Sequence, residues 1–289
     1  MGIREVGLIV NPSKWQALSF AHEVVAWLAA RDITVRVEAE AAARMERPDL
    51  ATGDGGLLGV DLIITLGGDG TILAASQVAA PHGIPVLGVH MGQFGFIAET
   101  HPDDLFADME KVLAGQAKVE ERMMVRGDVV RAGSILHTAY GLNDIVLNKG
   151  ARTRMLQLET SFGGDFVVSY LADGVVVATP TGSTAYALSA GGPLVEPTVQ
   201  ALMVTPICPH SLAARPLVVP ASEVITLSVE ANGGEVLLSA DSGQVFTLAA
   251  GDRVEARRAE FSARIVAIRH ASFYHKVRKR LLWGERLNA

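Results

Sequence analysis

The sequence contains a single cysteine, Cys208, and no long apolar run. One cysteine excludes an internal disulfide framework and is typical of a protein from a reducing compartment. No stretch approaches the roughly 18 uninterrupted apolar residues of a membrane-spanning helix. The apolar run Val6–Val10 is too short for the core of a secretory signal. These absences predict a cytoplasmic globular protein without a membrane partner.

Charged residues are also sparse, at 19% against 49% apolar residues. This balance argues against disorder and supplies enough apolar side chains for a real core. The net charge of −6 gives no sign of a nucleic acid partner. A chain of 289 residues is long enough for two domains, which we expect here.

Several common site motifs are absent as well. There is no G-x-x-x-x-G-K-S/T, which excludes a P-loop kinase, and no G-x-G-x-x-G follows a strand, so the usual dinucleotide fingerprint is missing. The histidines lack H-E-x-x-H or comparable spacing, so we assign no metal ligands. Ser183 lies outside a G-x-S-x-G elbow, which gives no support to a hydrolase. Cys208 lies in an apolar run and is interpreted as a packed or site-lining thiol.

The first part of the chain alternates between strand and helix patterns. Strand-like runs lie at Val6–Val10, Thr34–Val37, Leu62–Leu66 and Pro85–Val89. Apolar residues recur at helical spacing over Leu18–Leu28, and Asp103–Leu113 also has a helical pattern. Residues Ala39–Gly59 fit neither pattern. The alternation predicts an open parallel α/β sheet domain over residues 1–118.

Beyond Lys118 the pattern changes to many short strand-like runs separated by turns. They are Val125–Val130, Ile135–Tyr140, Ile145–Leu147, Met155–Thr160, Phe166–Tyr170, Val175–Ala178, Leu217–Val219, Val224–Val229, Val236–Ser239 and Val254–Ala256. This spacing predicts a β-rich second domain over residues 119–270. The basic end, Ser272–Arg286, is predicted to form a helix within residues 271–289 that packs on the first domain, with its charges in solvent.

The glycine turn Gly67–Thr71, G-G-D-G-T, follows an apolar strand and precedes a helical pattern. Such a turn offers backbone N–H groups and the positive end of a helix to a phosphate. Asp69 would repel that phosphate, so its presence indicates that it takes a proton or helps to hold a cation. The alternative is a plain turn in which Asp69 caps the helix.

Two later stretches carry polar groups at turns. The amide and carboxylate of Asn143-Asp144 can together bind a diol or an adenine edge, although the pair is also typical of a simple turn. After the strand Val175–Ala178, hydroxyls and backbone amides gather in T-P-T-G-S-T, with Tyr186 and Ser189 on one helical face beyond it. This loop suits the binding of a sugar or a phosphate. The alternative is that it is only a structural turn that caps the following helix.

Together these stretches resemble the NAD kinase family, whose members transfer the γ-phosphoryl group of ATP to the 2′-hydroxyl of the adenosine ribose of NAD. Lipid kinases and phosphofructokinases have similar glycine-aspartate turns, so the later segments discriminate. These are Asn143-Asp144, the block D-G…T-P-T-G-S-T-A-Y-A-L-S-A-G-G-P from Asp173, T-P-I-C-P-H from Thr205, and F-Y…L-x-W-G at Phe273–Gly284. They cover most of the chain beyond residue 60.

The resemblance implies roles for individual residues. Asp69 is similar to the catalytic carboxylate that accepts the 2′-hydroxyl proton, and Gly70 lies beside it against the ligand. Asn143 and Asp144 resemble an adenosine clamp, and Asp173 resembles the aspartate that reaches the nicotinamide side. The remaining implied substrate-binding residues are Arg154, as a cationic contact, and Thr181, Thr184, Ala185, Tyr186, Ala187, Leu188, Ser189 and Gln244.

The resemblance also implies the partners. ATP or inorganic polyphosphate is the expected phosphoryl donor, NAD the acceptor and a divalent cation such as Mg²⁺ the cofactor. NAD is expected between the domains, with Asp69 facing the loop at Thr184, in a homodimer or homotetramer whose neighbouring subunit helps to complete the site. Three departures are visible: His90 replaces a more usual asparagine, Leu171 replaces a basic residue of some members, and S-A-D-S-G-Q carries one extra residue, which weakens the assignment of Gln244.

Two other functions stay open at this point. A lipid or sugar kinase would share only the glycine-aspartate turn and would leave Thr179–Pro193 without a role. A dinucleotide-binding regulator without catalysis has no need of Asp69 beside a phosphate.

Overall fold

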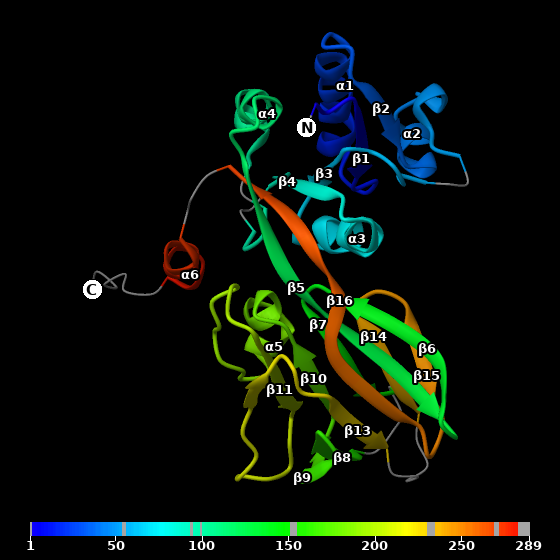
Figure 1. Ribbon diagram of the computed structural model, residues 1–289, viewed down its shortest axis with the longest axis vertical. Coiled ribbons are helices and arrows are strands. Elements are labelled where there is room, and N and C mark those ends of the chain that lie inside the picture. The colour runs from blue at the N-terminus through cyan, green and yellow to red at the C-terminus, as the bar shows by residue number, and fades with distance from the viewer. Residues whose placement is uncertain are drawn as a thin grey trace. The chain divides into compact units, whose positions relative to one another are not determined.

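The computed structural model describes residues 2–53, 56–92, 95–98, 100–150, 155–229, 235–268 and 272–282. The chain divides into two compact units, one of residues 1–121 with 263–289 and the other of residues 122–262. Figure 1 labels the helices and strands, and each unit is described by itself. Within the described ranges, every helix is too short or too polar to cross a membrane.

A parallel sheet with the strand order β2-β1-β3-β4 forms the centre of the first unit. Its strands are β1 (Glu5–Val10), β2 (Thr34–Val37), β3 (Leu62–Gly67) and β4 (Pro85–His90). The end of β16 (Arg253–Ala267) joins β4 in parallel, with Ile265 opposite Val86. The parallel α/β sheet predicted from the apolar runs is therefore confirmed, with strand ends that differ by one residue at most.

The helices of this unit are α1 (Trp15–Ala29), α2 (Ala39–Arg44), α3 (Asp69–Ala79), α4 (Leu105–Leu113) and α6 (Phe273–Leu281), with short 3₁₀ turns at Pro48–Leu50, Ala80–His82 and Pro102–Asp104. Of these, α1, α2 and α4 bury apolar residues against the sheet in one core. The sequence pattern missed α2, because a six-residue helix is too short to show a helical period. The predicted C-terminal helix is confirmed and belongs to the first unit, but the prediction that its charges lie in solvent is wrong for Lys276, which is buried.

The second unit is built from short strands in two sheets. They are β5 (Lys118–Arg131), β6 (Ser134–Gly141), β7 (Asp144–Lys149), β8 (Leu156–Phe162), β9 (Asp165–Ala172), β10 (Gly174–Ala178), β11 (Ala201–Ile207), β12 (Leu217–Pro220), β13 (Ile225–Val229), β14 (Val236–Ala240) and β15 (Val245–Leu248). One sheet is antiparallel with the order β12-β11-β10-β7-β14-β15. In the other, β16 pairs with β13 and β5, β13 with β8, β8 with β9, and β5 with β6 (Figure 1).

All the predicted strands of this unit are present, and β11 and β15 are additional. The strand β11 contains Pro206, although proline cannot donate to a central ladder. In the structure Pro206 pairs with Val175 of β10 but lies beyond the end of β12, whose register stops at Val204. The proline therefore meets a partner strand on one side only, and β11 tolerates it.

The strand β10 is buried on both faces, which explains its unbroken apolar sequence. Val175 and Val177 pack in the core that the two sheets share. Val176 and Ala178 face the other way and pack with Ala187 of the short helix α5 (Tyr186–Ser189). This double burial fixes the end of β10, where the hydroxyl-rich loop begins.

Substitution of Gly174 tests the close approach of β10 and β7. Gly174 lies opposite Asn148, and a Cβ at this position would lie 2.2 Å from the carbonyl oxygen of Leu147. We expect Gly174→Ala to force the strands apart and to lower the free energy of unfolding by about 1–3 kcal/mol, measured by urea denaturation. Gly53→Ala is the control, since a Cβ there meets nothing within 4 Å. Equal unfolding midpoints for the two variants would contradict the prediction.

Candidate functional site

Asp69 is the first residue of α3, at the carboxyl end of β3. Gly68 occupies the N-cap position, and its N–H donates to Oγ1 of Thr71 at 3.4 Å. A Cβ on Gly67 would lie 2.0 Å from the same Oγ1, so the chain requires glycine at this position. On Gly70 a Cβ would meet nothing within 4 Å. The turn thus has no space for a side chain at Gly67, whereas the space beside Gly70 is open.

The carboxylate of Asp69 is held by the segment after β4. Oδ2 accepts the N–H of Phe96 at 2.7 Å, and Oδ1 accepts those of Ile97 at 3.3 Å and Ala98 at 3.2 Å. A Cβ on Gly95 would lie 1.9 Å from Oδ1, so this close approach needs glycine. The carboxylate of Asp69 therefore accepts hydrogen bonds from a second loop. It does not cap its own helix, which the alternative of a plain capping turn required.

His90 belongs to the same end of the sheet. The side chain is buried, with Nδ1 3.1 Å from the carbonyl oxygen of Gly92 and its ring centroid 5.1 Å from that of His101. Burial is the largest cause that lowers the pKa of His90, and the neighbouring His101 acts in the same direction. His90 is consequently neutral at pH 7, and the residue that departs from the family pattern packs against its own loop.

Asn143 and Asp144 lie in the turn before β7, and a third residue holds them there. The carboxylate of Asp241 accepts the N–H groups of Leu142 and Asn143 at 2.7 Å each and that of Asp144 at 3.2 Å. The N–H of Asp241 in turn donates to the carbonyl oxygen of Asp144 at 3.1 Å. Three charge-assisted bonds to successive amides fix the backbone of the predicted clamp.

Burial and repulsion together perturb Asp144. The side chain is buried, and burial followed by the charge of Asp241 raises the pKa of Asp144 to about 7. Because the folded protein then holds this proton more tightly than the unfolded chain does, the group favours folding at low pH. That contribution is complete below about pH 4 and is lost as the pH rises through 7. Asp144 therefore changes charge in the neutral range.

The hydroxyl-rich loop packs directly on this turn. Thr179 donates its hydroxyl to the carbonyl oxygen of Leu142 at 2.5 Å and its N–H to that of Asn143 at 2.8 Å. A Cβ on Gly182 would lie 2.1 Å from the Asn143 oxygen. The structure thus brings together two stretches that are separated by more than thirty residues in the sequence, and Gly182 is required where they touch.

The other predicted residues of the loop differ in exposure. Thr181 and Ala187 are buried, and Thr184 donates its hydroxyl to the carbonyl oxygen of Thr181 at 3.2 Å. Tyr186 and Ser189 are both exposed, while Ala185 and Leu188 are half-buried. Burial, followed by the charges of Cys208, Asp144 and Asp173, raises the pKa of Tyr186. The phenol consequently remains neutral.

Asp173 forms an ion pair with Lys149 at 2.7 Å, and both side chains are partly exposed. Lys149 was not singled out in the sequence, although it shares a strand with Asp144. Gln244 is exposed in the turn between β14 and β15, three residues after Asp241. Arg154 lies outside the described residues.

Sequence reasoning missed Asp241. The only local signal was its position in S-A-D-S-G-Q, the stretch that also contains Gln244. Asp241 adopts a left-handed backbone, with φ of 51°, a conformation that aspartate tolerates better than most residues. Lys14 was also missed. Its ammonium donates to the carbonyl oxygen of Met91 at 2.8 Å, directly after the end of β4.

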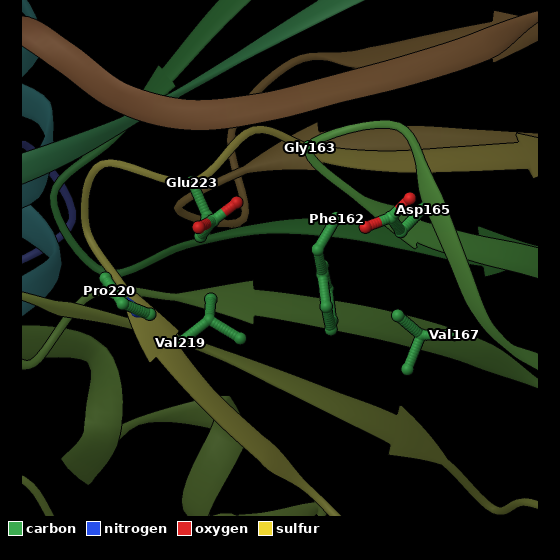
Figure 2. Close-up of a pocket in the computed structure, with 7 residues that line it drawn as sticks. All are labelled: Phe162, Gly163, Asp165, Val167, Val219, Pro220 and Glu223. Carbon is green, nitrogen blue, oxygen red and sulfur yellow. The ribbon is translucent and has the colours of Figure 1, made fainter.

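A pocket of about 460 Å³ opens in the second unit, away from these residues. Figure 2 shows its lining side chains, which come from the β8–β9 turn and from the segment around the end of β12: Phe162, Gly163, Asp165, Val167, Val219, Pro220 and Glu223. None of the predicted site residues lines it. The candidate site is therefore defined by hydrogen-bonded turns and not by this cavity.

Comparisons with known proteins match both parts of the chain. The profile described as the ATP-NAD kinase N-terminal domain matches residues 6–117, and the ATP-NAD kinase C-terminal domain profile matches residues 142–268. The NAD kinase of Symbiobacterium thermophilum is 48% identical over 275 residues, 95% of this chain and 97% of that protein. The NAD kinase of Moorella thermoacetica is 40% identical over 98% of this chain and 90% of that protein.

Two solved structures have a similar fold. Yeast NADH kinase, crystallised with NADH, gives a TM-score of 0.92 at 27% identity and covers 100% of this chain and 91% of its own. An NAD kinase from Archaeoglobus fulgidus, in complex with ATP, gives a TM-score of 0.73 at 22% identity and covers 97% of both chains. The latter supports the fold alone.

Asp241→Asn tests the coupling of the two carboxylates. The variant keeps the shape of the side chain but removes its negative charge, so we expect the pKa of Asp144 to fall below about 7 while burial keeps it above the ordinary value. The measurement is the ¹³C chemical shift of the Asp144 carboxyl as a function of pH. Glu223→Gln, at the remote pocket, is the control that leaves this titration in place. An unchanged titration in Asp241→Asn would show that burial acts alone.

Proposed function

The chain belongs to the NAD kinase family, and from this membership we propose that it transfers the γ-phosphoryl group of ATP to the 2′-hydroxyl of the adenosine ribose of NAD, which gives NADP. The observation that carries the proposal is the oriented carboxylate of Asp69 in a glycine turn at the start of a helix. A phosphoryl-transfer site depends mainly on positioning and charge neutralisation, and this turn offers both.

The bond changes of the proposed step are simple. The 2′-oxygen of the ribose forms a bond to the γ-phosphorus, while the bond from that phosphorus to the oxygen bridging the β-phosphorus breaks. ADP leaves with the electron pair of the broken bond, and the hydroxyl proton passes to the carboxylate of Asp69. No oxidant, reductant or further reactant takes part.

Asp69 is suited to accept that proton. A carboxylate has about four lone-pair positions, and the backbone N–H groups of residues 96–98 use three of them, one on Oδ2 and two on Oδ1. One position on Oδ2 is thereby left toward a hydroxyl, in an orientation set by the three bonds. General base catalysis of this kind contributes roughly 10²–10⁴-fold to the rate.

The second unit supplies the proposed recognition of NAD. Asn143 donates and accepts, and ionised Asp144 accepts, so the pair suits ribose hydroxyls or an adenine edge. The bonds from Asp241 and the packing of Thr179 hold the pair in place before any ligand arrives. We propose that Tyr186 and Asp173, which is ion-paired with Lys149 at the other end of β7, contact the rest of the dinucleotide. The other residues of this proposed surface are Gly70, Arg154, Thr181, Thr184, Ala185, Ala187, Leu188, Ser189 and Gln244.

Mg²⁺ is the proposed cofactor. Among the described residues, no group of three or more acidic, histidine or cysteine side chains is close enough to hold a metal ion. This fits Mg²⁺, which keeps several waters and binds through substrate phosphates with one or two protein carboxylates. The ion would be held mainly through the phosphates of ATP, since the one open position of the Asp69 carboxylate is assigned to the hydroxyl proton. When bound, the ion neutralises charge on the phosphoryl group.

We further propose that the protein works in the cytoplasm as a homodimer or homotetramer. Exposed apolar side chains on the outermost strands of the two sheets support self-association, among them Phe166 and Val167 on β9 and Val218 on β12. A mass in solution of two or four times 30.5 kDa, measured by light scattering, is the expected result. A species of 30.5 kDa at micromolar concentration would contradict it.

Asp69→Asn tests the reaction and the base together. We expect the purified parent to form NADP from NAD, ATP and Mg²⁺, and the variant to lose roughly 10²–10⁴-fold in kcat, because an amide cannot take the proton. Asp61→Asn is a matched control, since the Asp61 carboxylate also accepts backbone N–H groups, those of Arg4 and Glu5 at 2.8 and 3.0 Å, away from the glycine turn.

The other outcomes separate the alternatives. Turnover in parent and Asp69→Asn alike would keep the kinase and leave Asp69 as a turn residue. Binding of NAD without turnover, with polyphosphate also tried as donor, would indicate a regulator. Faster turnover with polyphosphate than with ATP would show that polyphosphate is the preferred phosphoryl donor, while NAD would remain the acceptor.

A further inference from the structure

The C-terminal helix α6 contains a buried lysine, although most of its charges are exposed. Ser272 caps the helix by accepting the N–H of His275 at 3.2 Å, and the side chains of Arg278 and Lys279 are exposed. Lys276 is only 4% exposed. A buried ammonium is unfavourable unless hydrogen bonds compensate its lost hydration, so the contacts of Lys276 indicate what it is for.

Lys276 and Arg280 both contact Phe96. The ammonium of Lys276 donates to the carbonyl oxygen of Phe96 at 3.2 Å. One helical turn further on, the guanidinium carbon of Arg280 lies 5.5 Å from the centre of the Phe96 ring, within the range of a cation–π contact. The helix therefore holds this one residue through its backbone and through its side chain.

The same peptide group faces Asp69 on its other side. The carbonyl of Phe96 and the N–H of Ile97 belong to one planar peptide, and that N–H donates to Oδ1 of Asp69. The N–H of Phe96 itself donates to Oδ2 at 2.7 Å, the shortest of the three bonds. Since C=O and N–H of a trans peptide point in opposite directions, a donor on the oxygen fixes the plane and strengthens the N–H as a donor.

We infer that Lys276 is a positioning residue, which orients the carboxylate of Asp69 through the peptide between Phe96 and Ile97. The inference rests on the proposed function, because it assigns a catalytic consequence to the orientation of Asp69. Without the lysine, the peptide can rotate and the carboxylate loses a fixed partner. A misplaced base lowers the rate of the chemical step, whereas the clamp that binds NAD is formed by other residues.

Lys276→Met is the central variant, because methionine preserves the length and removes the donor. We expect kcat to fall about tenfold with KM for NAD within about twofold of the parent. Lys276→Arg, which keeps a donor, should recover part of the loss. Arg278→Met removes one charge from the exposed face of the same helix and is the control, with kcat close to that of the parent.

A double-mutant cycle with Asp69→Asn separates positioning from general stability. If Lys276 acts through Asp69, Lys276→Met should reduce the residual rate of Asp69→Asn very little. An equal fractional loss in both backgrounds would overturn the inference, as would a rise in KM for NAD with unchanged kcat.

Hydrogen exchange supplies a readout without activity. Lys276→Met should speed exchange of the Phe96 and Ile97 amides, while core amides of β3 keep the parent's rates. Unchanged exchange at both amides would show that Lys276 does not hold the peptide between Phe96 and Ile97, and would overturn the inference. If the parent makes no NADP, the proposed function fails, and the exchange result still decides whether Lys276 holds this segment. If Lys276→Met does not fold, Lys276→Gln serves in the same measurements, since it retains a weaker, neutral donor.

Discussion

The hydrogen bonds between the Asp69 carboxylate and residues 96–98 depend on the parallel pairing of β3 and β4. In the register of the two strands Gly67 lies opposite His90, so both chains leave the sheet at the same edge. The carboxyl ends of neighbouring parallel strands meet there, and the loops that follow them lie within reach of each other. The sheet thus determines that the helix start carrying Asp69 finds backbone donors in the next loop.

An analogous constraint assembles the group of residues in the second unit. The strand β7 lies between β10 and β14 and is antiparallel to both. Its first residue, Asp144, therefore faces the last residue of β10, Ala178, and lies beside the end of β14 at Ala240. Three turns meet at one end of the sheet. Asp241 and Thr179 thereby hydrogen-bond to the turn that contains Asn143 and Asp144.

Much of the fold and part of the site could be predicted from the sequence. Apolar runs identified β1, β3 and β4, because burial of a strand on both faces leaves a continuous local pattern, whereas β2 alternates between exposed and buried residues. The glycine turn and the threonine-rich loop were recognisable because close backbone approach demands glycine. Strand β11 was not among the predicted strands; it accommodates Pro206 because its register with β12 ends at Val204.

Asp241 and Lys276 could not be predicted, and the reason is physical. An aspartate in a polar turn and a lysine on a basic helix have the local pattern of solvated surface residues. Their importance arises from partners about 97 and 180 positions away, the amides of Asn143 and Asp144 and the carbonyl of Phe96. The sequence by itself determined the fold class, most of the strands and the resemblance to the family. Only the tertiary structure decided which charges are buried and which amides they hold, because hydrogen bonding across strands leaves no periodic trace in either segment.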